Sequence, residues 1–534
     1  MKNILDITKG LNIPNEFVVP YGWDKAKIDL RFAETLKDKA EGKYVLVTSA
    51  MNANAAGEGK TSTEIGLNDA LRLLGVNSIA CLREPSQGVS YGNKGPAHGA
   101  LKARVIPDAI DYHFTGDIHA LTYAINSIAA QIDNVVYQGN ALNIDPNKIV
   151  WNRAIDVCDR AMRDATVMQG DKKGIPHHCE FVITVAHELS TIATLAKDEE
   201  DFVNRAEKAI VAYTYDDKPV TVGDLRMSKA IRNMMHEALM PNIVQSLEGN
   251  PVFVSGLPFA NISIGTNSVI ATKMAQRLAD VVLVESGFGS DCGGEKNLDL
   301  VCPSAGIKPS AIVAVCSCRS LKLHGGQDKN ELNIENVRAV RDGLCNLEAH
   351  IKHLKRYGLP LIIAINRFSF DTNAELKVIT DFLVEQKVKF EMSEAPLKGA
   401  VGSVGLAKLL MSELEKDIED YKPLYDWSES ILDKIADICK KTYGAAGVEY
   451  TEEALKQIED YTARGYGNLP ICISKTPASI TDDQKILGAP KDFKIHIREV
   501  RLFTGAGFLV PMSGTLLMLP GLGKTPRLSD DYEA

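Results

Sequence analysis

Short apolar runs alternate with helical patterns along most of this 534-residue chain. Seven of the runs are rich in Val, Ile and Leu and bounded by Gly, Asp or Pro: 44–48, 76–82, 181–185, 251–255, 280–284, 311–315 and 359–365. Such runs are typical of strands that are buried on both faces of a parallel sheet. Because helical patterns such as Thr61–Leu74 lie between them, the sequence predicts an α/β protein with a doubly wound, mostly parallel sheet.

A loop of small residues joins the first of these strands to a helix. The strand ends at Thr48, and the loop reads Met51-Asn-Ala-Asn-Ala-Ala-Gly-Glu-Gly-Lys-Thr61. Strand, loop and helix in this order are the context of a phosphate-binding loop, whose backbone N–H groups hold phosphate oxygens. Asn54 stands at the first glycine position of GxxxxGK[ST], and Asn tolerates a left-handed backbone. The alternative is an ordinary helix N-terminus that carries a lysine.

Residues of this loop are therefore candidates for nucleotide binding. The candidates are consecutive: Gly57, Glu58, Gly59, Lys60, Thr61 and Ser62. Lys60 is expected to neutralise phosphate oxygens, and Thr61 is expected to reach the Mg²⁺ that accompanies a nucleotide. The resulting fold would be like that of the P-loop NTPases. Glu64, in the first turn of the helix, would repel a phosphate unless its side chain points away.

The ends of two later strands also suit a P-loop ATPase. Glu285 follows the run 280–284, where contacts to Mg²⁺ and its water are expected, and Asn366 follows 359–365, where base recognition is expected.

Changes in the pattern suggest how the chain is divided. Residues 100–180 have a mostly helical pattern and are expected to be an insertion into the sheet. We expect a large nucleotide-binding domain at 1–385, a mainly helical or small α/β domain at 386–465, and a C-terminal α/β domain at 466–534.

Charge and composition argue against several classes of protein. The net charge is −9 and no long basic run occurs, so nucleic acid is not expected as the main partner. The N-terminus has no apolar stretch of a signal peptide, and no run approaches the roughly 20 apolar residues of a membrane span. The ten cysteines are scattered without a CxxC pair, which favours reduced thiols in a cytoplasmic protein.

Short motifs follow one another along the chain: Tyr21–Asp29, Ala56–Thr61, Arg83-Glu-Pro-Ser86, His113-Phe-Thr-Gly-Asp117, Leu321-Lys-Leu-His-Gly-Gly326 and Leu487-Gly-Ala-Pro490. In this order they resemble the formate–tetrahydrofolate ligase family over essentially the whole chain. The resemblance implies an ATP-dependent ligase of one-carbon metabolism that uses Mg·ATP, formate and tetrahydrofolate, with polyglutamylated tetrahydrofolate as a further candidate substrate. It also implies a homotetramer that is activated by K⁺ or NH₄⁺.

The chemistry that the resemblance implies has two steps. Formate attacks the γ-phosphate of ATP to give formyl phosphate and ADP, and N10 of tetrahydrofolate then attacks the formyl carbon and releases phosphate. Lys60 and Arg83 would hold the transferred phosphoryl group, Glu84 would contact substrate, and Asp117 would accept or orient the amine proton. Two structural alternatives stand beside these roles: Arg83 pairs with a carboxylate such as Glu84, and Asp117 is a turn or helix-capping residue.

The resemblance is weaker at the folate end. Phe368 matches the aromatic residue on which the family stacks the pterin ring, with burial in the core as the alternative. Pro396 stands where the family has a second stacking residue, a tryptophan. Phe370 replaces a small hydroxyl residue and is a candidate to stack on the pterin from the other side. The 386–465 domain would contribute to this cleft. These departures favour an atypical member with altered folate-site residues. The alternatives are the same acyl-phosphate chemistry on another acceptor or acid, and a non-catalytic nucleotide-binding paralogue.

Overall fold

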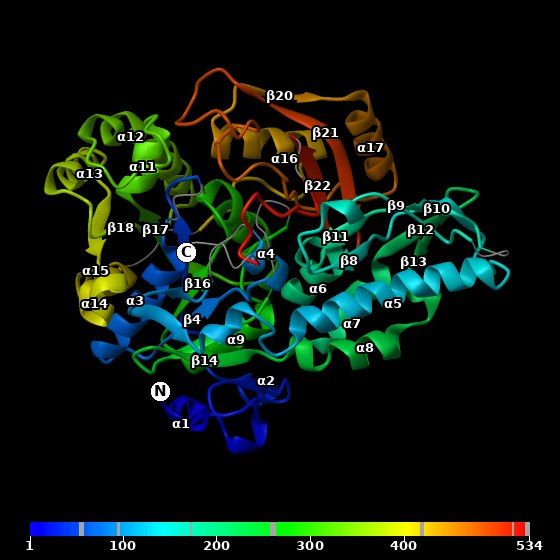
Figure 1. The fold of residues 1–534 in the computed structure, drawn as a ribbon, viewed down its shortest axis with the longest axis horizontal. Coiled ribbons are helices and arrows are strands. Elements are labelled where there is room, and N and C mark those ends of the chain that lie inside the picture. Colours follow the sequence, from blue (N-terminus) through cyan, green and yellow to red (C-terminus); the bar gives the residue numbers. More distant parts are fainter. Residues whose placement is uncertain are drawn as a thin grey trace.

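A 12-stranded sheet forms the centre of the computed structural model, which describes residues 1–52, 58–92, 97–170, 174–256, 263–416, 421–514 and 517–528 (Figure 1). Neighbouring strands in one part of it are all parallel, in the order β15 (Pro251–Val254), β4 (Ser78–Leu82), β16 (Val281–Glu285), β3 (Lys43–Ser49), β17 (Pro309–Cys316), β18 (Leu361–Asn366) and β19 (Lys389–Ser393). Six of the seven predicted runs lie here, which confirms a mixed α/β protein with a large, mostly parallel sheet.

The two faces of this sheet are covered by different helices. Side chains of a strand alternate between faces, so Val45 and Val47 point to one side and Leu46 to the other. Val45 and Val47 pack with α3 (Lys60–Leu73) and α15 (Val404–Leu414). Leu46 belongs to the larger core on the opposite face, to which α9 (Val269–Leu278) and α12 (Val337–Leu354) contribute. Burial on both faces explains why β3 reads as an unbroken apolar run.

Antiparallel strands extend the sheet beyond β15. β14 (Asn242–Ser246) pairs with β15 and with β2 (Ala26–Ile28), and β2 pairs with β1 (Val18–Pro20). Through this extension the N-terminal segment, at the bottom of Figure 1 with α1 (Ile4–Gly10), joins the main sheet. Lys27 of β2 lies opposite Asn242 of β14.

The segment 100–180 is not mainly helical, contrary to the prediction. It holds one long helix, α5 (Asp117–Tyr137), followed by the short strands β7 (Ile144–Ile149), β8 (Arg153–Ile155), β9 (Ala165–Val167) and β10 (His177–Cys179). Pro146 within β7 is incompatible with a continued helix. The predicted run 181–185 forms β11 (Phe181–Ile183), which pairs with β8 instead of entering the main sheet. The continuous apolar pattern therefore identified a strand there but not its partner.

The sheets cross both of the predicted domain boundaries. β19 pairs with β18, so the main sheet continues past residue 385. A separate sheet joins β20 (Gly447–Tyr450) to β21 (Lys494–Phe503) and β22 (Phe508–Ser513), and it therefore spans residue 465. Contacts between strands far apart in sequence decide these limits, and composition does not record them.

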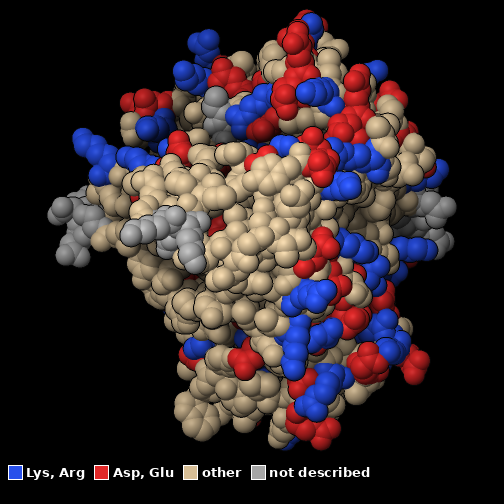
Figure 2. All heavy atoms as spheres, turned by 90° about the vertical axis from the view of Figure 1, so that its right-hand side faces the viewer, with Lys and Arg blue, Asp and Glu red and all other residues tan. Residues whose placement is uncertain are grey.

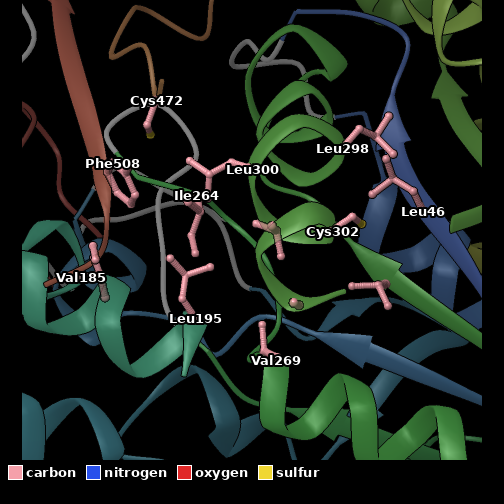
Figure 3. Close-up of a cluster of buried hydrophobic side chains, with 14 of the residues drawn as sticks. Leu46, Val185, Leu195, Ile264, Val269, Leu298, Leu300, Cys302, Cys472 and Phe508 are labelled. Carbon is pink, nitrogen blue, oxygen red and sulfur yellow. The ribbon is translucent and has the colours of Figure 1, made fainter. Parts of the chain in front are cut away.

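One hydrophobic core joins the main body, the 100–200 region and the C-terminal sheet. Figure 3 shows Leu195 below Ile264, with Val185 and Phe508 to their left and Cys472 above. These side chains are all buried and belong to one core cluster. The C-terminal sheet is therefore packed against the rest of the chain by apolar contacts.

Charged residues of both signs are mixed on the molecular surface. In the view of Figure 2 they gather along the right-hand and upper parts of the face, while a broad area beside them carries mostly uncharged residues. A long basic stripe, as a nucleic acid would need, is not visible on this face. Within the described part of the chain, helices that combine the length and apolarity of a membrane span are absent.

Candidate active site

The carboxyl ends of the parallel strands carry the predicted site. Ser49 of β3 leads into the small-residue loop, and α3 begins at Lys60. Gly59, the residue before the helix, has φ 76°. A Cβ on Gly59 would lie 2.1 Å from Nδ2 of Asn366, which donates a hydrogen bond to the Glu58 carbonyl over 3.1 Å. Both the left-handed backbone and the close approach of Asn366 therefore require glycine here.

The loop residues are placed as follows. Gly57 and Asn54 lie outside the described residues. Nζ of Lys60 is 2.9 Å from Oε2 of Glu58, and both side chains are buried. Ser62 is buried in the first turn of α3.

Glu285 connects the loop to the neighbouring strands. Its Oε1 accepts a hydrogen bond from the Thr61 hydroxyl over 3.1 Å and one from Nη2 of Arg83 over 3.0 Å. Burial raises the pKa of Glu285, but the charges of Arg83 and Lys60 outweigh burial and hold that pKa below its usual value. The three strand ends therefore present a buried carboxylate balanced by two cations. Arg83 does pair with a carboxylate, but the carboxylate is Glu285.

The Glu64 side chain contacts the neighbouring strand β4. It is fully buried, and its Oε1 accepts the backbone N–H of Cys81 on β4 over 3.1 Å. Burial, together with the charge of Glu285, raises the pKa of Glu64 well above its usual range. A protonated Glu64 adds no negative charge beside the helix N-terminus.

A second buried polar group surrounds Asp117. Asp117 is the first residue of α5, after Gly116 at the N-cap. Nζ of Lys27 lies 2.7 Å from Oδ1 and 2.9 Å from Oδ2 of Asp117, and Nδ2 of Asn242 donates to Oδ2 over 2.7 Å. Glu84 forms a hydrogen bond with the Asp117 carboxyl group. A helix-capping role for Asp117 is therefore not what the contacts show.

A cavity opens beside this pair of carboxyl groups. Its volume is about 200 Å³, and its lining includes Glu84, Asp117, Asp156, Tyr112, His113 and His119. Burial, and next the charge of Asp117, raise the pKa of Glu84 well above its usual range. Glu84 therefore keeps its proton to a higher pH than an exposed glutamate would.

The candidate folate residues are only partly brought together. The rings of Phe368 and Phe370 stack, with centroids 5.4 Å apart and an angle of 11° between their planes. Cζ of Arg319, after β17, lies 5.7 Å from each centroid. Both rings are half-buried, so Phe368 is not simply a core residue.

Pro396 belongs to a different contact group. It lies in the first turn of α14 (Ala395–Lys398), where proline is well tolerated, and its carbonyl accepts the N–H of Lys102 over 3.1 Å. α14 packs closely on α3, since a Cβ on Gly66 would lie 2.1 Å from that of Ala395.

The sequence analysis did not identify Lys27, Asn242 or Arg319 as members of these groups. It placed Glu285 near the Mg²⁺ site but did not predict that Glu285 pairs with Arg83. Lys27 lies in the Tyr21–Asp29 motif, which was noticed without a function. Asn366 follows its strand as expected, but its side chain lies over Gly59. A residue's position after a buried strand is the signal that finds Glu285 and Arg319; nothing local marks Asn242.

Two comparisons bear on the whole chain. A family model described as formate–tetrahydrofolate ligase matches residues 1–531. The formate–tetrahydrofolate ligase of Bartonella tribocorum is 45% identical over 527 residues, which cover 98% of this chain and 94% of that protein. Identity of this extent gives no support to the interpretation of the chain as an atypical member.

Proposed function

Because this chain belongs to the formate–tetrahydrofolate ligase family, we propose that it forms 10-formyltetrahydrofolate from formate, tetrahydrofolate and Mg·ATP through formyl phosphate. The observation that carries the proposal is the junction at Glu285, which accepts from both Thr61 and Arg83 next to the Lys60–Glu58 pair. Two cations and a helix N-terminus thus lie together at the carboxyl ends of the parallel strands. Phosphoryl transfer requires positive charge of this kind around the transferred group.

The first step joins formate to the γ-phosphate. A formate oxygen attacks phosphorus, the bond to the ADP oxygen breaks, and the electron pair leaves with ADP. Lys60 supplies a point charge and Arg83 two parallel N–H donors for the phosphoryl oxygens. The Thr61 hydroxyl and the Glu285 carboxylate offer oxygen atoms of the type that Mg²⁺ prefers, so the residues fit the ion that accompanies ATP.

The second step transfers the formyl group to the amine. N10 attacks the formyl carbon, the carbon–oxygen bond to phosphate breaks, and the nitrogen gives up its proton. Asp117, held by Lys27, is the base or orienting group for that proton, and Glu84 lines the same cavity. Phe368 and Phe370 offer the aromatic surface for the pterin ring, whereas Pro396 contributes shape at the neighbouring strand end.

Further family properties are proposed with this activity. They are a P-loop NTPase-like doubly wound fold, a homotetramer, activation by K⁺ or NH₄⁺, and a cytoplasmic location. Polyglutamylated tetrahydrofolate is a candidate substrate.

ADP release and 10-formyltetrahydrofolate formation test the proposal directly. Purified protein is incubated with Mg·ATP, K⁺ and formate, with and without tetrahydrofolate. We expect both products only with all substrates, and a Lys60→Met variant to lose at least about 100-fold in rate. Lys148→Met, on β7 where Lys148 pairs with Asp217, is the control and should keep the wild-type rate. If formate-dependent ADP release is equally fast with and without tetrahydrofolate, the acceptor is another molecule. If ATP is not turned over at all, the protein is a non-catalytic paralogue.

A further inference from the structure

Lys27 is an unusual lysine because it is completely buried. Its exposed fraction is 0%, and it lies in β2 opposite Asn242 of β14. Its ammonium group contacts both oxygens of Asp117 and lies 3.3 Å from the carbonyl of Met240. A buried lysine is stable only where such partners compensate for lost hydration. The N-terminal segment of the chain therefore supplies a fixed positive charge to the Asp117 group.

We propose that Lys27 is a positioning residue that keeps the negative charge of the Glu84–Asp117 pair on Asp117. The proposal rests on the role assigned above to Asp117 in the second step. Lys27 acts through the carboxylate that it binds.

The geometry leaves one proton to be shared by the two carboxyl groups. Lys27 and Asn242 donate to Asp117 from the sheet side, so its oxygens accept and do not carry a proton. Glu84 then donates to Asp117, consistent with its raised pKa. When the amine gives its proton to Asp117, the carboxyl pair becomes neutral, and the positive charge that the amine carried is removed. Without Lys27 the first proton would be held more tightly, and the pair would bind a second proton at higher pH.

Other titratable groups face the same pair and must be considered. Asp156, which follows β8, lines the cavity and accepts from Ser86 over 2.6 Å. His113 and His119 line the cavity from either end of the Gly116 turn. The charge of Asp117 also acts on Tyr21, whose pKa burial and its bond to Glu237 raise to about 12. Lys27 differs from all of these because it touches both oxygens of Asp117.

The first test compares the pH dependence of kcat/KM for tetrahydrofolate in the wild type and Lys27→Met. We expect the acidic limb to move to higher pH by at least one unit in Lys27→Met, with a loss of rate of about 10-fold or more at pH 6. In Lys27→Arg, which keeps the positive charge, the acidic limb should lie close to its position in the wild type. Formyl phosphate formation, followed as ADP formed on the enzyme and measured after quenching of a single turnover with formate alone, should be nearly unchanged because this step does not use the amine.

Lys434→Met is the matched control for loss of a buried lysine. Lys434 is also fully buried, but it donates to the backbone carbonyls of Trp427, Gly467 and Leu469 instead of to a carboxylate. It should lower stability without moving the acidic limb. A limb that stays in place in Lys27→Met, or that moves equally in Lys434→Met, overturns the proposal.

A second measurement covers the case in which Lys27→Met does not fold. In the infrared difference spectrum between the wild type and Glu84→Gln at pH 7, the C=O band of one protonated carboxyl group should be lost, and the band of Glu64 cancels because both proteins contain it. A difference spectrum that lacks this band would overturn the arrangement. The proposed function is tested by a different result: it is wrong if the wild type makes no 10-formyltetrahydrofolate.

Discussion

Thr61 donates its hydroxyl to Oε1 of Glu285 over 3.1 Å, which ties the first turn of α3 to the end of the neighbouring strand β16. The same oxygen accepts from Arg83 at the end of β4. One carboxylate thereby fixes a helix N-terminus and a cation that come from different parts of the chain. Because Glu285 is 3% exposed, water does not screen these contacts.

Glu285→Gln should therefore be strongly destabilising. The amide can still accept from Thr61 but carries no charge to balance Arg83, and breaking a buried ion pair from one side typically costs about 3–5 kcal/mol. The free energy of unfolding, measured with urea in the absence of nucleotide, should fall by about that amount. Glu499→Gln is the control, because Glu499 pairs with Arg501 while both side chains are 29% exposed, and such pairs contribute about 1 kcal/mol or less. Equal losses in the two variants would contradict the prediction.

Gly59→Ala should reduce the affinity for Mg·ATP. The new methyl group would meet Asn366 at 2.1 Å and force a positive φ on alanine, which costs about 1 kcal/mol or more by itself. We expect the loop to shift and the Kd for ATP, measured by calorimetry, to rise at least about 10-fold. Gly75→Ala has the same backbone strain, with φ 83°, but a Cβ there meets no atom within 4 Å. If both variants bind ATP alike, strain and not the Asn366 contact accounts for any loss.

The fold was predictable where one apolar run makes one strand. β3, β4, β15, β16, β17 and β18 are buried on both faces and carry that signal. β19 reads Lys-Phe-Glu-Met-Ser, lies at the sheet edge and shows no such run, and β14 is polar at both ends because Asn242 and Gln245 bond to distant groups. Their places depend on tertiary contacts that local periodicity does not encode.

The site was predictable to the same extent. Lys60 and Thr61 could be found from their position after a strand and loop, whereas Arg83 became a candidate through the family resemblance. Their partners could not, since Glu285 is 202 residues from Arg83, and Lys27 is 90 residues from Asp117. Which charges pair across such separations depends on the order of strands in the sheet. That order cannot be derived from the sequence pattern alone.

Phe368→Ala should weaken binding of tetrahydrofolate but not of ATP. Stacking of a base on an aromatic side chain contributes about 1–3 kcal/mol, so KM for tetrahydrofolate should rise about 5- to 150-fold. Phe370→Ala should have a comparable effect if both rings contact the substrate, and a smaller one if Phe370 only supports Phe368. Phe503→Ala removes a half-buried ring from a pair with Phe508, 5.6 Å between centroids, in the C-terminal sheet. It controls for loss of an aromatic contact as such, and an equal rise in KM there would refute the assignment of Phe368.

His187→Asn should become relatively more stable than the wild type as the pH falls. His187 precedes α6 (Glu188–Leu195), and its Nδ1 accepts the N–H of Leu189 over 3.1 Å. Burial lowers the pKa of His187 to about 3. Below pH 6.5 His187 is therefore protonated in the unfolded chain but stays neutral in the folded protein. The free energy of unfolding of the wild type decreases as the pH falls.

Asparagine keeps the capping oxygen but does not titrate. The difference in unfolding free energy between variant and wild type should hence change by about 1.4 kcal/mol per pH unit between pH 6.5 and 4.5, in favour of the variant. Urea unfolding at half-unit intervals measures it, and the plateau between pH 7.5 and 8.5 is the internal control. Neighbouring Glu188, whose pKa burial raises to about 7, is present in both proteins, so its opposite contribution cancels in the difference. A difference that stays flat through pH 5 would mean that His187 accepts a proton in the folded state, and with it that the capping contact to Leu189 breaks on acidification.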